Sequence, residues 1–191
     1  MTLYIVVLNI ILAGFCDEAV TVLGLYYKIQ TFFFIPLFAL QTCIVPVLSY
    51  NYARKNNDRC MKIVSTSIGS SVVFMLIGVF CFEFLPKPLI TLFSSDKNVL
   101  DIGIHAFRII GLSFVPAVFS LIYPVFFQAI GAAKPSVLLA ITRQLFCLIP
   151  IFAVLSLIGL NYVWFAFPLS EIITGGIGFL LYAKWKRNAV T

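Results

Sequence analysis

The chain has 191 residues, of which 62% are apolar and only 10% are charged, and its formal net charge is +6. Soluble domains average roughly 45–50% apolar and about 25% charged residues, so a soluble fold of this composition would expose large apolar patches and aggregate. The composition therefore excludes an ordinary soluble domain and predicts an integral membrane protein. The basic residues lie in loops beside apolar segments, where they indicate topology and contacts with lipid headgroups rather than nucleic acid.

The membrane-spanning segments are predicted to be helices rather than barrel strands. A spanning helix needs about 20 apolar residues, whereas the strands of a membrane barrel alternate between apolar and polar residues. Residues 63–85 and 137–160 are apolar nearly throughout, without alternation. The expected fold class is therefore an all-α integral membrane bundle.

Six spans are predicted, and together they form a single transmembrane lobe over residues 1–191. The first apolar run has only about 13 residues, or about 20 Å of helix, so we interpret it as a span whose beginning is missing. A mixed segment over residues 89–101 is expected to form a short helix at the membrane interface. The spans are predicted at residues 1–16, 20–50, 63–85, 104–130, 137–160 and 162–183.

The basic residues distinguish the two sides of the membrane. With six crossings, nine of them fall on one side and two or three on the other, which is a clear positive-inside bias. We therefore expect the N-terminus and the C-terminus to face the cytoplasm. The cytoplasmic set is Arg54, Lys55, Arg59, Lys62, Lys134, Arg143, Lys184, Lys186 and Arg187, and the opposite set is Lys87, Lys97 and Arg108.

Two charged residues are predicted to lie deep in the membrane. Ionisable side chains cost at least about 2.5–3.5 kcal/mol at mid-helix, and they persist where they are paired or face a water-filled pathway. Lys28 in the second span and Glu171 in the sixth enter from the same side to similar depths, so a contact between them is geometrically feasible. They either line a transport pathway or form a structural pair, unless Lys28 snorkels outward.

Seven further polar residues could hydrogen-bond a substrate within the membrane: Asn9, Tyr26, Tyr27, Gln30, Gln41, Tyr123 and Gln128. Each could equally bond a neighbouring helix, an interaction worth about 0.6 kcal/mol on average. Arg143, near the cytoplasmic start of the fifth span, is expected to act as a cytoplasmic anchor or a gate.

Signatures of catalysis, of metal binding and of ATP hydrolysis are absent from the sequence. HExxH, GxSxG and P-loop motifs do not occur, and the five cysteines are scattered without a CxxC or Cys/His cluster. We expect neither an enzyme nor a resident metal or cofactor. Any transport would be secondary or powered by a partner.

Several short motifs occur along the chain in a specific order and spacing. They are residues 24–36 (GLYYKIQTFFFIP), Pro46, residues 50–59, residues 128–131, Lys134-Pro135, Arg143-Gln144, Gly159-Leu160, Val163-Trp164, Pro168 and Glu171. From about Asn9 to the C-terminus the chain resembles the multidrug and toxic compound extrusion (MATE) family, closest to bacterial members that export cationic drugs and dyes. One departure is the loop after the second span, which usually reads Asn-x-Gly-Ala and here reads Asn51-Tyr52-Ala53-Arg54. The glycine of a tight turn is therefore missing.

The resemblance implies twelve helices in two six-helix lobes around a central cavity, with export driven by inward flow of H⁺ or Na⁺. This chain is similar to the second lobe only. Its short first apolar run is similar to span seven without the beginning of that span. Family members that couple export to ion flow through this lobe use acidic residues in spans seven and ten. Residues 104–130 contain no Asp or Glu, so the coupling acid is expected in the absent first lobe.

The leading hypothesis is the C-terminal half of a secondary multidrug exporter in a bacterial inner membrane. It would act on small cationic or aromatic substrates and need an N-terminal six-helix lobe or a homodimer partner. One alternative is a flippase for a lipid-linked precursor, although its pyrophosphate would call for several deep basic residues and only Lys28 is deep. Another alternative is a truncated or accessory membrane subunit that transports nothing alone.

Overall fold

The computed structural model describes residues 3–190, which are almost entirely helical and contain no strand. In chain order the helices are α1 (Leu3–Ala13), α2 (Asp17–Ala53), α3 (Asn57–Phe84), α4 (Pro86–Thr91), α5 (Lys97–Gly111), α6 (Phe114–Ala129), α7 (Ala133–Ile141), the π-helix η1 (Thr142–Leu148), α8 (Ile149–Ser156), α9 (Leu160–Val163) and α10 (Ala166–Val190). The predicted all-α fold class is confirmed.

Four of these segments are long and apolar enough to cross a membrane: α2, α3, the continuous run α7–η1–α8, and α9–α10. Helices α5 and α6 together make a fifth candidate span, bent by 50° at their junction. Helix α1 is apolar but has only 11 residues. Each of the six predicted spans therefore overlaps one of these segments.

The predicted interfacial helix over residues 89–101 is wrong. Helix α4 ends at Thr91, residues 92–96 are not helical, and α5 starts at Lys97. The break has a local cause, because the Asp96 carboxylate accepts a hydrogen bond from the backbone N–H of Asn98 at 2.8 Å. An aspartate in this position caps the first turn of a helix and so fixes a new start.

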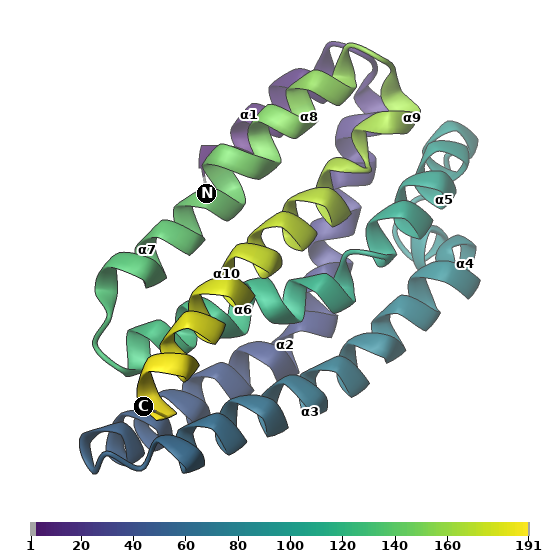
Figure 1. Ribbon diagram of the computed structural model, residues 1–191. Helices are drawn as coiled ribbons and strands as arrows, with labels where there is room; N and C mark the ends of the chain where they lie inside the picture. The colour runs from purple at the N-terminus through teal and green to yellow at the C-terminus, as the bar shows by residue number, and fades with distance from the viewer. Residues whose placement is uncertain (1–2, 191) are drawn as a thin grey trace.

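Helix α10 runs through the middle of the bundle, between α7–α8 on one side and α2, α3 and α6 on the other (Figure 1). It packs closely against α6 because α10 presents glycines there. A Cβ atom at Gly178 would lie 2.7 Å from the Tyr123 ring, and one at Gly175 would lie 3.2 Å from Cβ of Phe119. Small residues allow membrane helices to approach to this degree.

A cluster of aromatic rings joins α3, α5 and α6 around Phe82. The Phe82 ring lies 4.7 Å from that of Phe114 and stacks on that of Phe107 at 4.9 Å, measured between centroids. All three side chains are fully buried. Such ring pairs add stabilisation beyond the apolar area they bury.

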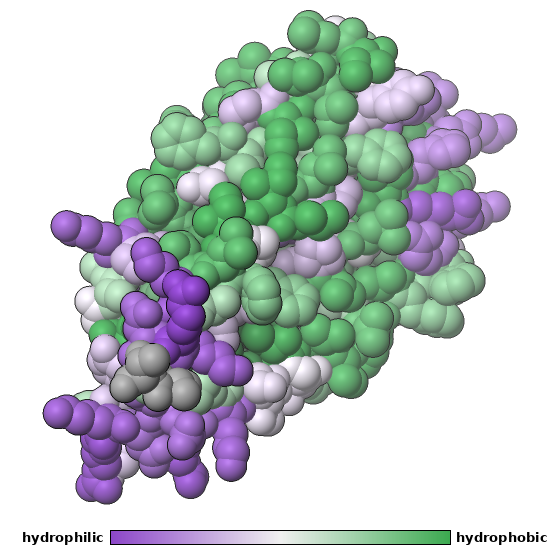
Figure 2. Space-filling view, in the orientation of Figure 1, coloured by the Kyte–Doolittle hydropathy of each residue, from purple (hydrophilic) through white to green (hydrophobic). Residues whose placement is uncertain are grey.

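The outer surface has the polarity expected of a membrane protein. Figure 2 shows a broad apolar surface between two polar ends. Large apolar side chains on several helices face outward, including Phe32 (71% exposed) and Leu180 (68% exposed). Lipid or another protein must cover this surface.

The turn between α2 and α3 forms without the glycine that the family pattern places there. Lys55 adopts the left-handed conformation with φ of 58°, a region that non-glycine residues occupy at some energetic cost. The Arg54 guanidinium lies 4.4 Å from the centroid of the Tyr50 ring, and the Asn56 side chain accepts a hydrogen bond from the N–H of Arg59 at 3.2 Å. These contacts stabilise the turn on both sides of Lys55.

The close approach of α6 and α10 can be tested with Gly178→Ala. We expect this variant to lower the free energy of unfolding by about 1–3 kcal/mol, the usual cost of overpacking. Gly176→Ala, two residues away, is the matched control, because no atom lies within 4 Å of its added Cβ. The measurement is thermal stability in detergent. Equal stability of the two variants would contradict the packing described for Gly178.

Candidate functional site

A small polar cavity lies in the interior of the bundle, between α1, α2, η1 and α10. Its volume is about 30 Å³, and a cavity needs about 10–15 Å³ to hold one water molecule. Its lining is mostly hydroxyl, amide and charged groups: Tyr4, Tyr26, Tyr27, Gln30, Arg143, Gln144, Leu148, Phe167, Ser170 and Glu171. The cavity is therefore large enough for a water molecule and forms a polar centre within an otherwise apolar bundle.

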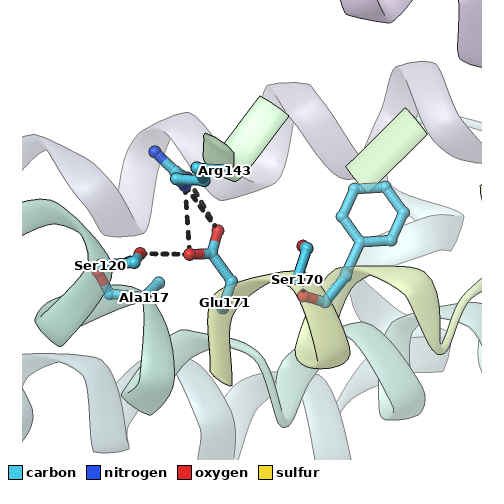
Figure 3. A network of polar contacts seen from close by, with 6 residues as sticks. Ala117, Ser120, Arg143, Ser170 and Glu171 are labelled. Atoms are coloured by element: carbon cyan, nitrogen blue, oxygen red, sulfur yellow. Dashed lines mark hydrogen bonds and ion pairs between the residues drawn. The ribbon is translucent and has the colours of Figure 1, made fainter. Parts of the chain in front are cut away.

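An ion pair between Arg143 and Glu171 forms one wall of this cavity (Figure 3). The Nη2 atom of Arg143 lies 2.8 Å from Oε1 of Glu171, and its Nε donates to Oε1 at 2.9 Å and to Oε2 at 3.1 Å. The Ser120 hydroxyl also donates to Oε2. The side chains of Arg143 and Glu171 are only 21% and 11% exposed. The carboxylate is therefore compensated in charge and well supplied with donors.

The local sequence accounts for the irregular helix around Arg143. Pro150 has no N–H to donate to the carbonyl of Phe146, and its ring clashes with that carbonyl in a regular α-helix. The widened turns of η1 lie directly before it, over residues 142–148. Turns of this kind are frequent at functional sites.

Arg143 lies deeper in its span than the sequence led us to expect. The helix begins at Ala133 rather than at residue 137, and Pro135 is tolerated there because it falls in the first turn. Arg143 is consequently about 15 Å from the start of the helix, at 1.5 Å per residue. Its guanidinium faces Glu171 inside the bundle rather than the headgroups.

The predicted site residues separate into two groups. Tyr27, Gln30 and Glu171 meet at the polar cavity together with Arg143. Lys28 is exposed and makes no ion pair within residues 3–190, so the feasible Lys28–Glu171 contact does not form and Lys28 follows the alternative of an outward-facing side chain. The partner of Glu171 is Arg143 because α2 turns the Lys28 side chain outward.

Two further predicted residues lie away from the cavity. Gln128 is exposed near the end of α6. Tyr123 is buried, with its ring 6.3 Å from Phe119, 6.5 Å from Phe179 and 5.5 Å from Tyr182 between centroids. Tyr123 therefore packs α6 against α10 and does not line the polar cavity.

Sequence reasoning found Tyr26 but missed several other residues of the site: Tyr4, Ser120, Gln144 and Ser170. Ser120, Arg143 and Glu171 come from three separate helices, and nothing in their spacing shows that they meet. One signal did exist, because a deep carboxylate requires a cationic partner. This requirement predicts a basic residue at the same membrane depth as Glu171, but it does not identify which basic residue.

An apolar groove lies on the other side of Glu171, between α6 and α10. Its volume is about 340 Å³. It is lined by Val115, Pro116, Phe119, Glu171, Ile172, Gly175, Gly176 and Phe179. A carboxylate beside aromatic rings in an apolar groove suits a ligand with an apolar body and a positive charge. No cluster of three His, Cys, Asp or Glu suited to a metal ion occurs in the described part of the chain.

The energetic coupling of the ion pair can be measured with a double-mutant cycle. Arg143→Gln or Glu171→Gln leaves a buried charge without its partner, so we expect each to lower the free energy of unfolding by about 3–5 kcal/mol. The double variant is neutral at both positions and should recover most of this loss. Thermal unfolding in detergent provides the measurement. If the double variant loses as much free energy of unfolding as the two single variants lose together, the residues are not coupled.

Comparison with known proteins is consistent with this architecture. The MatE family model matches residues 1–155. The multidrug export protein MepA of Staphylococcus aureus (strain MSSA476) is 23% identical over 167 residues, which are 86% of this chain and 36% of MepA. MepA of Staphylococcus haemolyticus is 21% identical over 186 residues, or 97% of this chain and 40% of that protein. A protein of Shewanella oneidensis named FAD transporter is 22% identical over 170 residues, which are 88% of this chain and 38% of that protein.

Solved structures show the same fold. An outward-facing multidrug resistance MATE transporter of the MOP superfamily superposes with a TM-score of 0.92 at 21% identity, covering 100% of this chain and 44% of the other. A MOP superfamily transporter from Pyrococcus furiosus, described as having a binding pocket of reverse polarity, gives 0.89 at 21% identity, with coverage of 100% and 44%. The chain thus spans less than half the length of these relatives. Since the MatE model matches most of its residues, this chain belongs to the MATE family of membrane transporters and has the fold of one six-helix lobe.

Proposed function

We propose that this chain is the C-terminal half of a secondary multidrug exporter, which moves small cationic or aromatic compounds outward in exchange for inward-moving H⁺ or Na⁺. The observation that carries the proposal is the position of Glu171. Glu171 lines both the polar cavity and the apolar groove. An apolar cation in the groove would place its charge near this carboxylate and its rings near Phe119 and Phe179.

Binding of such a cation would act on the contact between helices. Glu171 is already compensated by Arg143, so an incoming positive charge competes with the guanidinium for the same oxygens. The pair joins η1 to α10, and the Ser120 hydroxyl adds α6. Occupancy of the groove would thereby weaken or shift a contact that holds three helices together, which gives substrate binding a means of favouring one arrangement of the lobe.

The charge distribution favours an exporter of cations over a flippase. A pyrophosphate-bearing substrate calls for surplus positive charge at membrane depth. Arg143 is neutralised by Glu171, and Lys28 faces outward. Because one relative is named for the transport of FAD, which is an anion, transport assays should include an anionic dye beside the cationic one.

We further propose that a second six-helix unit completes the transporter, either an N-terminal lobe or another copy of this chain. The relatives it matches are more than twice as long, and the wide apolar surface of the lobe needs cover. The membrane would be a bacterial inner membrane, with both termini in the cytoplasm. The α2–α3 turn, the α6–α7 connection and the end of α10 lie at one end of the bundle (Figure 1), and basic residues concentrate there.

Efflux of a fluorescent cationic dye from an efflux-deficient bacterium tests this function. We expect export when the chain is co-expressed with the N-terminal lobe of a MATE relative, and none when a monomeric chain is expressed alone. An anionic dye provides the control for charge selectivity. Robust export by the monomer would contradict the half-transporter proposal. Absence of export with the lobe, despite normal membrane insertion, would indicate an accessory subunit.

The role of the groove can be tested by filling it with Gly176→Leu. We expect dye efflux to fall at least about ten-fold, the usual effect of losing about 1.4 kcal/mol of binding, with membrane expression unchanged. Gly69→Leu on α3 is the control, since neither glycine has an atom within 4 Å of an added Cβ and Gly69 does not line the groove. Unchanged efflux in Gly176→Leu would exclude the groove from the transport pathway.

A further inference from the structure

A second groove lies at the basic end of the bundle, between the start of α3 and the end of α10. Its volume is about 390 Å³. The two helices are joined beside it by a hydrogen bond from Nδ2 of Asn57 to the carbonyl of Ala189 at 3.2 Å. The groove is lined by Met61, Lys62, Val64, Ser65, Ile68, Tyr182 and Lys186. We refer to these seven residues as the α3–α10 groove.

The α3–α10 groove has a charged level and an apolar level. Lys62 and Lys186 are exposed and come from different helices, so two positive charges flank one opening. Ile68 lies about 9 Å farther along α3 than Lys62, at 1.5 Å per residue, with Val64 between them. A ligand that fits both levels carries an anionic group at one end and a long apolar portion at the other.

The charges around the groove are predominantly positive. Neither Lys62 nor Lys186 takes part in an ion pair within residues 3–190. Asp58 is the acidic residue near this end of α3. The basic residues nearby in sequence are Arg54, Lys55, Arg59, Lys184 and Arg187. The groove thus offers a phosphate two unpaired ammonium groups in a positive surrounding field.

The aromatic side chains beside this groove are typical of the level of the lipid headgroups. Tyr182 lines the groove and stacks on Trp185 with 5.8 Å between ring centroids. The Trp185 ring lies 6.5 Å from Tyr52 and 4.7 Å from Phe126. Tyrosine and tryptophan concentrate where the bilayer meets water, and this tendency favours a depth of the two lysines near the phospholipid phosphates.

We propose that the α3–α10 groove is a binding site for an anionic phospholipid. The phosphate lies between Lys62 and Lys186, the ester groups of the glycerol backbone meet Ser65 and the Tyr182 hydroxyl, and one acyl chain follows Ile68 into the membrane. This site is separate from Glu171 and from the transport pathway proposed above. A lipid bound here ties the start of α3 to the end of α10.

The test measures binding of phosphatidylglycerol to the full chain in detergent, together with any partner lobe that copurifies. The variant is K62Q/K186Q, and binding is followed by native mass spectrometry and by thermal stabilisation. We expect affinity to fall about 30-fold, because each basic residue near a membrane surface contributes about a five-fold effect. Phosphatidylcholine, which has no net charge, should bind the wild-type chain much more weakly and discriminate little between the variants.

Two control variants distinguish the groove from general attraction between a basic protein and anionic lipid. K134Q removes a charge at the same end of the bundle but outside the groove, and K87Q/K97Q removes two charges from the predicted opposite side. Both should retain wild-type affinity for phosphatidylglycerol. Thermal unfolding without added lipid shows whether K62Q/K186Q is folded, and the comparison is made between folded proteins.

Three results would overturn the proposal. Equal losses in K62Q/K186Q and in the controls would indicate diffuse attraction only. Displacement of the lipid by millimolar inorganic phosphate would indicate a site for free anions. Equal affinity for long-chain phosphatidylglycerol and for its water-soluble headgroup would show that the apolar level of the groove contributes nothing.

Discussion

A carboxylate and a guanidinium that face each other inside a membrane bundle constrain everything around them. Each charge alone would cost at least about 2.5–3.5 kcal/mol at mid-helix. Glu171 avoids this cost because Arg143 and Ser120 supply its oxygens with donors. The contact requires α6, η1 and α10 to keep one relative register. Gly175 and Gly178 of α10 make that register attainable because they pack closely against α6. The central position of α10 follows from these two requirements.

This constraint coincides with the least regular helix of the lobe. The run α7–η1–α8 changes from α to π geometry over residues 142–148 and carries Pro150 immediately afterwards. Such a segment can bend where a regular helix would resist. Arg143 therefore links this irregular helix to α10 in the centre of the bundle. In the proposed transporter, whose lobes would open and close a pathway, a strong contact at an irregular point of the helix would allow movement without exposing an unpaired charge to the membrane.

The sequence predicted the fold class and the family well, because composition and long apolar runs determine them directly. It predicted the partners of the deep charges poorly. Lys28 matched Glu171 in depth, but depth does not reveal which way a side chain faces on an apolar helix. The depth of Arg143 in the bundle follows from a helix start at Ala133 and from the widened turns of η1. Neither feature produces a clear periodic pattern of apolar residues in the sequence. The break before Lys97 was readable in principle, since Asp96 is a strong helix cap, but the mixed composition of residues 89–101 concealed it.

The state of Glu171 inside the folded lobe is the most direct test of the central claim. Difference infrared spectroscopy between the wild-type chain and E171Q isolates the vibrations of this one side chain. An ionised carboxylate held by Arg143 should give carboxylate stretching bands and no band of a protonated acid, and R143Q should alter those bands. A protonated-acid band in the wild-type chain, or carboxylate bands unaffected by R143Q, would contradict the ion pair as the constraint on which the lobe depends.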